Sequence, residues 1–336
     1  MKRIIFVSLL AILLLSSCKD RPLIYHVFEG PIFGTSFKIE YEYFENKNLE
    51  RDIIKLMKEF DLSLSTYNPR SIISLVNSNN EDVEPDVYFR TVFNRSQQIS
   101  KSTDGAFDLT VAPLVNAYGF GFTEEDVEIV SDARIEELLT ITGYEKIRIK
   151  DNKIIKDDPR LMLDASAIAK GYSVDVVSMF LEEKGINSYM VEIGGEVRCK
   201  GMNSKGVSWR IGVDKPIENM IGREIQVVLN LTDVALATSG NYRQFRLVGE
   251  VKYSHTIDPR TGRPVTHNLL SSTVLASDCM TADAYATAFM VLGLERSMEI
   301  VKGDPDLEAY FIYGDEEGAY KSTYSAGLKD ILEDLY

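Results

Sequence analysis

Apolar residues recur three or four positions apart in several segments, which is the spacing that places them on one face of a helix. Residues 48–64 show this pattern most clearly. Their apolar positions are Leu49, Ile53, Leu56, Met57, Phe60 and Leu64. Further helices are predicted over 85–101, opened by Pro85, over 166–184, ended by Gly185, over 278–292, and from residue 294.

Other segments alternate between apolar and polar residues or are rich in aromatic residues, which is typical of strands. Residues 32–44, IFGTSFKIEYEYF, are the clearest case. Strands are also predicted at 144–149, 153–156, 188–193, 196–200, 208–213, 223–230, 251–257, 271–277 and 308–313. Residues 123–137 are expected to form an acidic loop running into a helix, and the chain is expected to end in a short tail. The irregular alternation, without repeats or long linkers, predicts one α+β domain with two lobes rather than a doubly wound parallel sheet.

The first 17 residues have a different character. Lys2 and Arg3 precede IIFVSLLAILLL, an apolar run too short to span a bilayer but typical of a signal peptide. The run ends in LSSC, which resembles a bacterial lipobox, where cleavage would leave Cys18 free to carry lipid. An ordinary secretory signal with an incidental cysteine is the alternative. We expect a lipoprotein signal peptide over 1–17, a tether over 18–30 and a domain over 31–336, anchored by lipid on the extracytoplasmic (periplasmic) side of the cell membrane.

The charge of the chain excludes some function classes. Loss of residues 1–17 would remove two basic residues and no acidic one, so the formal net charge would change from −14 to −16. An acidic surface of this size argues against nucleic-acid binding. Three scattered histidines and no paired CxxC argue against a zinc cluster. We expect Cys199 and Cys279 to be free, buried thiols.

Four polar segments interrupt the apolar pattern. They are GAFDLTV (105–111), LDASAIAKGYSVD (163–175), VEIGGEV (191–197) and YSHTIDPRTGRPV (253–265). Each has a structural explanation when taken alone: Asp164 as a helix cap, Gly194-Gly195 as a bulge, DPRTG as a turn and His255 as a core histidine. Taken together, they offer hard oxygen ligands, a lysine, an imidazole, and glycines that let a ligand approach the backbone.

The segment DCMTADAYATAFMVL (278–292) adds two oxygen ligands to an otherwise apolar helix. Asp283 and Thr287 are four residues apart, so they lie on one helical face. Capping and core packing remain the alternative explanation. Hard oxygen ligands suit Mg²⁺ better than zinc or copper, and Mg²⁺ usually accompanies phosphate. The chain has no GxxxxGK[ST] loop and no GxGxxG motif, so a nucleotide would have to bind in another way.

Seven segments in order, over roughly residues 31–300, resemble the blocks of the ApbE-type flavin transferases, the FAD:protein FMN transferases, which are often lipoproteins. These segments are GTSF, STYNPRSIISLVN, GAFDLTVAPLVNAYGFG, DASAIAKGYSVD, IGGEV, SHTIDPRTGRPV and DCMTADAYATA. Two departures from the usual pattern are Ala165-Ser166, where the family has a bulkier residue and glycine, and Tyr285, where leucine is common. Neither departure falls on an expected ligand.

The resemblance implies a two-lobed, T-fold-like α+β domain that holds FAD in the cleft between the lobes. A divalent ion, Mg²⁺ with Mn²⁺ left open, would lie on the FAD pyrophosphate and be bound by Asp283, Thr287 and the main-chain carbonyl of Ala167. His255 matches the histidine proposed as base. The expected FAD contacts, including the two glycines singled out above, are Phe33, Tyr67, Ala106, Phe107, Asp108, Asp164, Lys170, Gly194, Gly195 and Ile257.

The implied reaction transfers FMN from FAD to a Thr or Ser hydroxyl of another exported protein and releases AMP. A hydroxyl needs a base, which suits the imidazole of His255, and the charge that develops on oxygen could be stabilised by Mg²⁺ with Asp283 and by Lys170. Tyr67 and Phe107 offer flat faces for a ring. The acceptor would be a subunit of an electron-transfer or ion-pumping complex. FAD hydrolysis to FMN and AMP, or non-catalytic flavin storage by a lipoprotein, are the alternatives.

Overall fold

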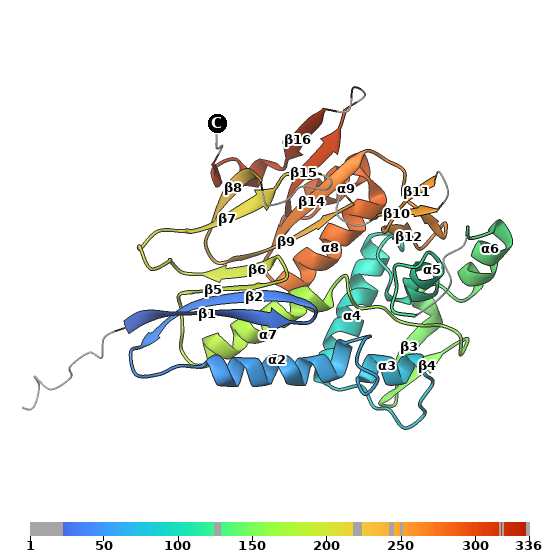
Figure 1. The fold of residues 1–336 in the computed structure, drawn as a ribbon, viewed down its shortest axis with the longest axis horizontal. Coiled ribbons are helices and arrows are strands. Elements are labelled where there is room, and N and C mark those ends of the chain that lie inside the picture. Colours follow the sequence, from blue (N-terminus) through green and yellow to red (C-terminus); the bar gives the residue numbers. More distant parts are fainter. Residues whose placement is uncertain are drawn as a thin grey trace, which may run out of the picture.

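The protein is described by a computed structural model that covers residues 23–123, 129–217, 224–241, 245–248, 251–315, 317 and 319–333. Its centre is an eight-stranded antiparallel sheet with the order β1-β2-β5-β6-β9-β14-β15-β16 (Figure 1). These strands span Leu23–Ile32 (β1), Thr35–Phe44 (β2), Tyr189–Ile193 (β5), Glu196–Lys200 (β6), Val234–Gly240 (β9), Leu269–Ala276 (β14), Glu308–Gly314 (β15) and Tyr320–Tyr324 (β16).

Helices cover one face of this sheet. Helix α7 (Ala169–Glu183) packs on β5 and β6, and α8 (Cys279–Leu292) packs on β9 and β14. Outside them lie α2 (Glu50–Leu64), which contacts α7, and α4 (Val87–Ser102), which contacts α8. Helix α8 is buried on nearly every side, which explains why its sequence is apolar all round rather than amphipathic. The remaining helices on this side are α3 (Ile72–Asn77) and α9 (Leu294–Gly303).

A three-stranded sheet covers the other face. It has the order β17-β8-β7, with bounds Leu332–Glu333 (β17), Ile225–Leu231 (β8) and Trp209–Asp214 (β7). Trp209 and Leu229 pack with Met190, Leu236 and Ile312 of the large sheet in one buried cluster. Alternate residues of β5 therefore face two different cores, with Met190 in this cluster and Tyr189 and Val191 in the cluster on the helix side, because successive strand residues point to opposite sides of a sheet.

A smaller lobe lies at one end of the large sheet (Figure 1). It comprises α5 (Ala112–Ala117), α6 (Asp132–Thr140), the hairpin of β3 (Ile147–Lys150) and β4 (Lys153–Lys156), and the strand pairs β10 (Phe245–Val248) with β11 (Val251–Ser254) and β12 (Ile257–Asp258) with β13 (Arg263–Pro264). It also contains the short 3₁₀ turns 109–111 and 144–146. Leu114, Leu138 and Ile257 belong to its own apolar cluster, separate from the cores around the sheets.

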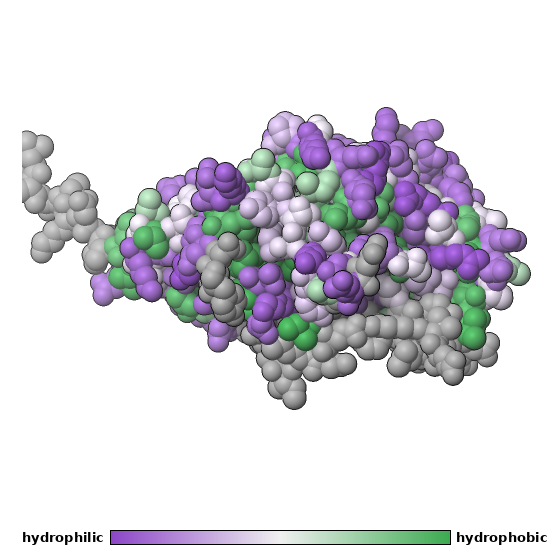
Figure 2. Space-filling view, turned by 90° about the horizontal axis from the view of Figure 1, so that it is seen from above, coloured by the Kyte–Doolittle hydropathy of each residue, from purple (hydrophilic) through white to green (hydrophobic). Residues whose placement is uncertain are grey.

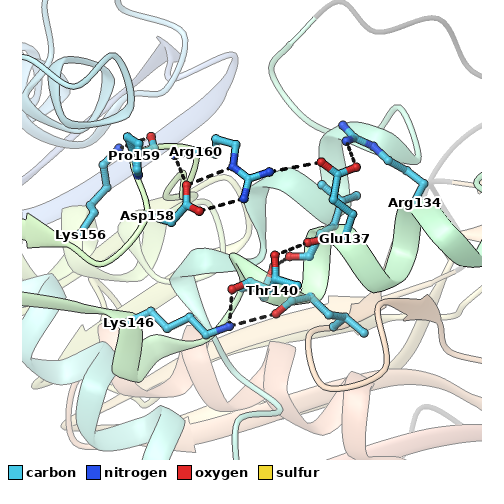
Figure 3. Close-up of polar contacts among 11 residues, drawn as sticks. Arg134, Glu137, Thr140, Lys146, Lys156, Asp158, Pro159 and Arg160 are labelled. Carbon is cyan, nitrogen blue, oxygen red and sulfur yellow. Dashed lines mark hydrogen bonds and ion pairs between the residues drawn. The ribbon is translucent and has the colours of Figure 1, made fainter.

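Polar contacts brace this lobe (Figure 3). The Lys146 ammonium donates to the carbonyls of Leu139 and Thr140 at the end of α6, at 3.0 and 2.7 Å. Arg160 pairs with both Asp158 and Glu137, at 2.8 and 3.2 Å. Lys146 thus satisfies carbonyls at the C-terminal end of α6 and holds it against the turn before β3, whereas Arg160 joins Glu137 of α6 to the segment that follows β4.

The α+β class and the predicted helices are confirmed, each helix within three residues of its expected start. Both thiols, Cys199 and Cys279, are free and buried as expected. Residues 1–17 and Cys18 lie outside the described residues. Over the part of the chain that the structure describes, no helix is long and apolar enough to cross a membrane.

Four strand predictions were wrong. Residues 23–30, expected to be a tether, belong to β1, which pairs with β2 along its whole length from Leu23–Phe44 to Ile32–Thr35. Strand β9 was not predicted, and residues 320–324, expected to be a tail, form β16. The predicted strand 251–257 is broken after Ser254, whose hydroxyl accepts from the Thr256 N–H at 3.2 Å.

Candidate active site

A cavity of about 1110 Å³ lies where the large sheet, its helices and the smaller lobe meet. Most of the predicted site residues line it, although they come from segments far apart in the sequence. These residues are Phe33, Tyr67, Ala106, Phe107, Asp108, Asp164, Ala167, Lys170, Gly194, His255, Ile257, Asp283 and Thr287. Gly195 is the exception. It occupies the second position of the β5–β6 turn with φ 105°, and its N–H donates to Glu192 Oε1 at 2.8 Å. A turn accounts for this glycine.

Asp283 is held by the start of α7. Its Oδ2 accepts from the Gly171 N–H at 2.9 Å, and the residue is almost fully buried. In a regular helix the Gly171 N–H would donate to the carbonyl of Ala167, four residues earlier. Here that N–H points to Asp283 instead. Both Ala167 and Asp283 line the cavity.

Helices α7 and α8 each supply a carboxylate that accepts hydrogen bonds from N–H groups of the other helix. Asp283 of α8 accepts from α7, and Asp175 of α7 accepts from the N–H groups of Cys279 and Met280 at the start of α8, at 2.9 and 2.8 Å. Arg198 donates to the same Asp175 at 2.9 Å. Asp175 thus satisfies two of the unpaired N–H groups at the N-terminus of α8 and favours its helix dipole. This arrangement fixes how far Asp283 projects into the cavity.

Thr287 lies on the same side of α8 as Asp283, as its four-residue spacing predicted. Its hydroxyl is 3.1 Å from that of Ser239 on β9, and both residues line the cavity. Among the described residues, no group of three or more His, Cys, Asp and Glu side chains lies close enough to bind a metal. The predicted ligand set is of another kind, with one carboxylate, one hydroxyl and one carbonyl. These are hard oxygen ligands, so the chemistry of the set fits Mg²⁺.

Lys170 forms an ion pair at the edge of the cavity. Its ammonium donates to Glu196 Oε1 at 2.6 Å, and the Glu196 carboxylate is almost fully buried. The other oxygen of Glu196, Oε2, has no hydrogen-bond partner among the described residues. Gly194 packs over this pair, because a Cβ atom at Gly194 would lie 3.2 Å from Glu196 Oε2 and 3.3 Å from Lys170 Cδ.

The charges around Lys170 do not balance. Burial raises the pKa of Asp283, against the opposing effects of Lys170 and the Gly171 N–H, and burial likewise raises the pKa of Glu196. Burial lowers the pKa of Lys170, but Glu196 and Asp283 outweigh it, so this pKa lies above its ordinary value. Two buried carboxylates share one ammonium. A bound cation would supply the missing positive charge, which is a second reason why the residues fit a metal.

His255 lies in the break between β11 and β12. Its ring is 6.3 Å from that of Phe120, in an edge-on arrangement. The next residue, Thr256, is buried, and its hydroxyl donates to Asn241. Ile257 then anchors the segment in the apolar cluster of the smaller lobe. This local structure places the His255 imidazole on the part of the cavity wall that the smaller lobe provides, whereas Asp283 lines the cavity from α8.

Asp108 and Asp164 support the cavity wall with their side chains. Asp108 accepts from the N–H and hydroxyl of Thr110 and from the Tyr144 N–H, each at 2.7 Å. Burial raises its pKa to about 6, although these hydrogen bonds oppose the shift. Asp164 accepts from the Ser166 N–H at 2.8 Å, in the turn before α7. The turn explains why α7 begins at Ala169 rather than at 166.

The three predicted aromatic residues differ in exposure. Phe107 is buried in the core behind the cavity, Phe33 is half-buried against Phe60 at 5.9 Å, and Tyr67 is 79% exposed. Phe33 has φ 51°, in the β1–β2 turn, which brings this turn to the cavity. Tyr67 is therefore the ring with the most free surface for a ligand.

Three residues around the site were missed in the sequence. Glu196 lies in IGGEV and Asp175 in LDASAIAKGYSVD, but neither was singled out. Ser239 lies on β9, which was not predicted. Alternation gave no signal for Glu196, because it places Glu196 on the same face of β6 as the half-buried Arg198 and Lys200.

The comparisons with known proteins identify the family of the chain. Residues 33–311 match the ApbE family. The chain is 38% identical over 332 residues to the FAD:protein FMN transferase of Vibrio cholerae, with 97% of this chain and 98% of that protein covered. It is 33% identical over 316 residues to the enzyme of that name from Escherichia coli, with 91% and 89% covered.

Solved structures show the same fold. The flavin transferase ApbE from Vibrio cholerae superimposes with a TM-score of 0.82 at 37% identity, over 92% of this chain and 100% of that one. The apo form of the Pseudomonas stutzeri flavinyl transferase ApbE gives 0.81 at 28% identity, over 92% and 97%. Sequence, cavity and fold agree, and the chain belongs to the ApbE family of flavin transferases.

Proposed function

We propose that this protein transfers the FMN moiety of FAD to a Thr or Ser hydroxyl of another exported protein and releases AMP. The observation that carries the proposal is the single cavity lined by His255, Lys170, Asp283 and Thr287, in a chain that covers nearly all of the length of relatives named FAD:protein FMN transferase.

In the proposed reaction the acceptor hydroxyl oxygen forms a bond to the phosphorus on the FMN side of the FAD pyrophosphate. The bond from that phosphorus to the bridging oxygen breaks, and AMP leaves with the oxygen. His255 takes the hydroxyl proton, a role that suits an imidazole whose ordinary pKa is near neutrality. Lys170, held by Glu196, offers its ammonium to the negative charge on the phosphate oxygens.

A divalent cation would be bound by Asp283, Thr287 and the Ala167 carbonyl, and would supply Lewis-acid stabilisation of the pyrophosphate. Gly171 supports this ligand set by donating to Asp283 while leaving the Ala167 carbonyl out of the first helical turn. Tyr67 and Phe33 offer rings against which a flavin or an adenine could stack.

We further propose that Cys18 carries lipid and anchors the protein outside the cytoplasm, with an electron-transfer or ion-pumping subunit as acceptor. The LSSC sequence supports the anchor. Replacement of Cys18 by Ala should move the protein from the membrane fraction to the soluble fraction.

One incubation tests the reaction. The protein, FAD, Mg²⁺ and an exported acceptor carrying a Ser/Thr motif are mixed, and intact-protein mass spectrometry follows the acceptor. A covalent flavin-phosphate adduct on a hydroxyl residue, lost in His255→Ala, is the expected result. Rapid release of FMN and AMP with no acceptor present would favour FAD hydrolysis instead. Tight FAD binding without turnover under any condition would favour flavin storage.

A further inference from the structure

Exposed apolar side chains gather at one end of the large sheet. Of the thirteen large hydrophobic side chains exposed among the described residues, five lie on β1 or on the connection between β6 and β7. These five are Leu23, Ile24, Val27, Met202 and Val207. Figure 2 shows hydrophobic surface at this end of the molecule, beside the point where the described chain begins. Single exposed apolar residues are ordinary, but a group from two segments indicates a contact surface.

The two segments are physically joined. Leu23, Tyr25 and Val27 lie on one side of β1, because alternate strand residues share a face. Tyr25 lies between Leu23 and Val27. Its hydroxyl donates to the Met202 carbonyl at 2.6 Å, and its ring lies 6.3 Å from that of Trp209. Leu23 and Val27 therefore flank the very contact that holds the β6–β7 connection in place.

One aromatic residue borders this surface. Phe44 pairs with Leu23 in the β1–β2 register, so the two side chains share one face of the hairpin. Aromatic rings beside apolar side chains are typical of segments that sit at a membrane–water interface. Glu40 and Glu42 lie opposite Val27 and Tyr25, so the surface favours zwitterionic over anionic lipid.

The length of chain before β1 limits where this surface can be. Five residue steps separate Cys18 from Leu23, and a fully extended chain of that length reaches about 18 Å. A lipid on Cys18 would hold the start of β1 within that distance of the headgroups. No other part of the described chain is constrained so tightly.

We propose that the membrane-end surface, made of Leu23, Val27, Met202 and Val207 with Phe44 at its border, rests on the phospholipid bilayer. This proposal depends on the lipid anchor proposed for Cys18. Strand β1 leads from this surface to the Phe33–Gly34 turn, which lines the cavity. Ten residues of strand span about 30 Å. The β1–β2 hairpin would therefore hold the cavity up to that distance above the lipid, where the acceptor hydroxyl has to arrive.

The only tryptophan of the chain makes the proposal testable. Trp209 lies behind Tyr25, next to the proposed surface. The full-length lipoprotein is reconstituted in phosphatidylcholine vesicles that contain a headgroup-dansylated lipid, and energy transfer from Trp209 to dansyl is measured. The test variant is Val27→Glu with Met202→Glu, and the matched control is Val87→Glu with Tyr320→Glu, two exposed positions elsewhere on the domain.

Wild type and control should show equal energy transfer from Trp209 to dansyl. The test variant should lose at least half of this energy transfer while still sedimenting with the vesicles. Its FMN transfer to a detergent-solubilised acceptor should be unchanged, which separates this surface from the proposed function. Equal energy transfer in all three proteins would overturn the proposal that this surface rests on the bilayer. Failure of the wild type to sediment with vesicles would overturn the anchor, and the surface with it, whatever the transferase assay shows.

Discussion

Asp283 is the residue where the contacts of the site converge. It accepts from Gly171, lies beside the Lys170–Glu196 pair, and shares one face of α8 with Thr287. Each contact comes from a different segment, so the geometry of this one carboxylate depends on α7, β6 and α8 together. A carboxylate so placed is sensitive to loss of charge more than to loss of volume.

Replacing Asp283 by Asn tests that dependence. The amide can still accept from Gly171, so the fold should persist, but the charge that attracts a cation is gone. We expect Mn²⁺ affinity, measured by electron paramagnetic resonance of the free ion, to fall by at least about 100-fold, together with FMN transfer. Thr287→Val removes a neutral ligand and should cost less. Unchanged Mn²⁺ binding in Asp283→Asn would remove Asp283 from the ligand set.

Asp108 gives a prediction about pH. Burial raises its pKa to about 6 in the folded protein, from 3.8 in the unfolded chain. The folded state therefore holds this proton more tightly, and as pH rises from 5 to 8 the stabilisation linked to it is lost, by about 1 kcal/mol. Asp108→Asn lacks the titration. The stability of the variant relative to wild type should thus improve by that amount between pH 5 and pH 8.

Urea unfolding of both proteins at the two pH values measures this difference directly. The absolute cost of the substitution cancels, because only the change with pH is compared. An identical pH dependence for wild type and Asp108→Asn would mean that the buried carboxyl titrates in the ordinary range in the folded protein.

Residue types could be predicted at this scale better than residue roles. The polar segments pointed to Asp164, Lys170 and His255, and the helix 278–292 pointed to Asp283, since polar side chains are conspicuous in apolar surroundings. Glu196 was not found, because its burial depends on strand register and on Lys170, which lies 26 positions away in the sequence. Roles that depend on such long-range pairs cannot be read from local pattern.

At the scale of elements, the crossing of α7 and α8 determines the site. Gly171 is the point of closest approach: a Cβ atom there would lie 2.3 Å from the Cys279 carbonyl oxygen and 2.7 Å from Asp283 Cβ. The first of these neighbours is backbone, which cannot rotate away. Glycine is therefore required by space, since helical glycines are otherwise unfavourable relative to alanine.

Gly171→Ala should force the helices apart and destabilise the protein by about 2 kcal/mol or more, with loss of FMN transfer. Denaturant unfolding and the transfer assay measure the two effects. Gly303→Ala is the matched control, because Gly303 ends α9 and, apart from its chain neighbours, no atom of the described residues lies within 4 Å of its Cβ position. It should be neutral within about 0.5 kcal/mol. Equal stability of the two variants would contradict the close approach.

Helices were predicted more reliably than strands for a physical reason. A helix such as α2 shows one apolar face over fifteen residues. Strand β9, with the sequence VALATSG, lies between β6 and β14 in the middle of the sheet and shows no alternation. A strand covered on both sides has no polar face, so its pattern is not informative.

At the scale of the whole molecule, the N-terminal boundary of the domain is decided by the large sheet. The sequence pattern predicted a tether over residues 18–30, but β1, with the sequence LIYHVFEGPI, begins at Leu23. In the structure it is the edge strand of the sheet, and Phe28 packs edge-on against Phe37 and Tyr41, at 5.5 and 6.4 Å. The antiparallel sheet is thus completed by residues outside the seven family segments.

Two shortened chains test this boundary. A chain that begins at residue 23 keeps every strand of the large sheet and should melt at the wild-type temperature. A chain that begins at residue 33 loses β1 and exposes Phe37 and Tyr41, so its Tm should fall by at least about 5 °C. Differential scanning calorimetry compares them. A melting temperature unaffected by the loss of β1 would mean that residues 23–30 act as a tether and do not stabilise the domain.

The two internal thiols have a practical consequence. Cys199 belongs to the core beneath the three-stranded sheet and Cys279 to the core beneath α2 and α7, and burial raises the pKa of both. A reagent such as iodoacetamide can reach either sulfur only after its own layer opens. Pulsed alkylation followed by peptide mapping would therefore time the opening of each layer separately, with natural probes already in place.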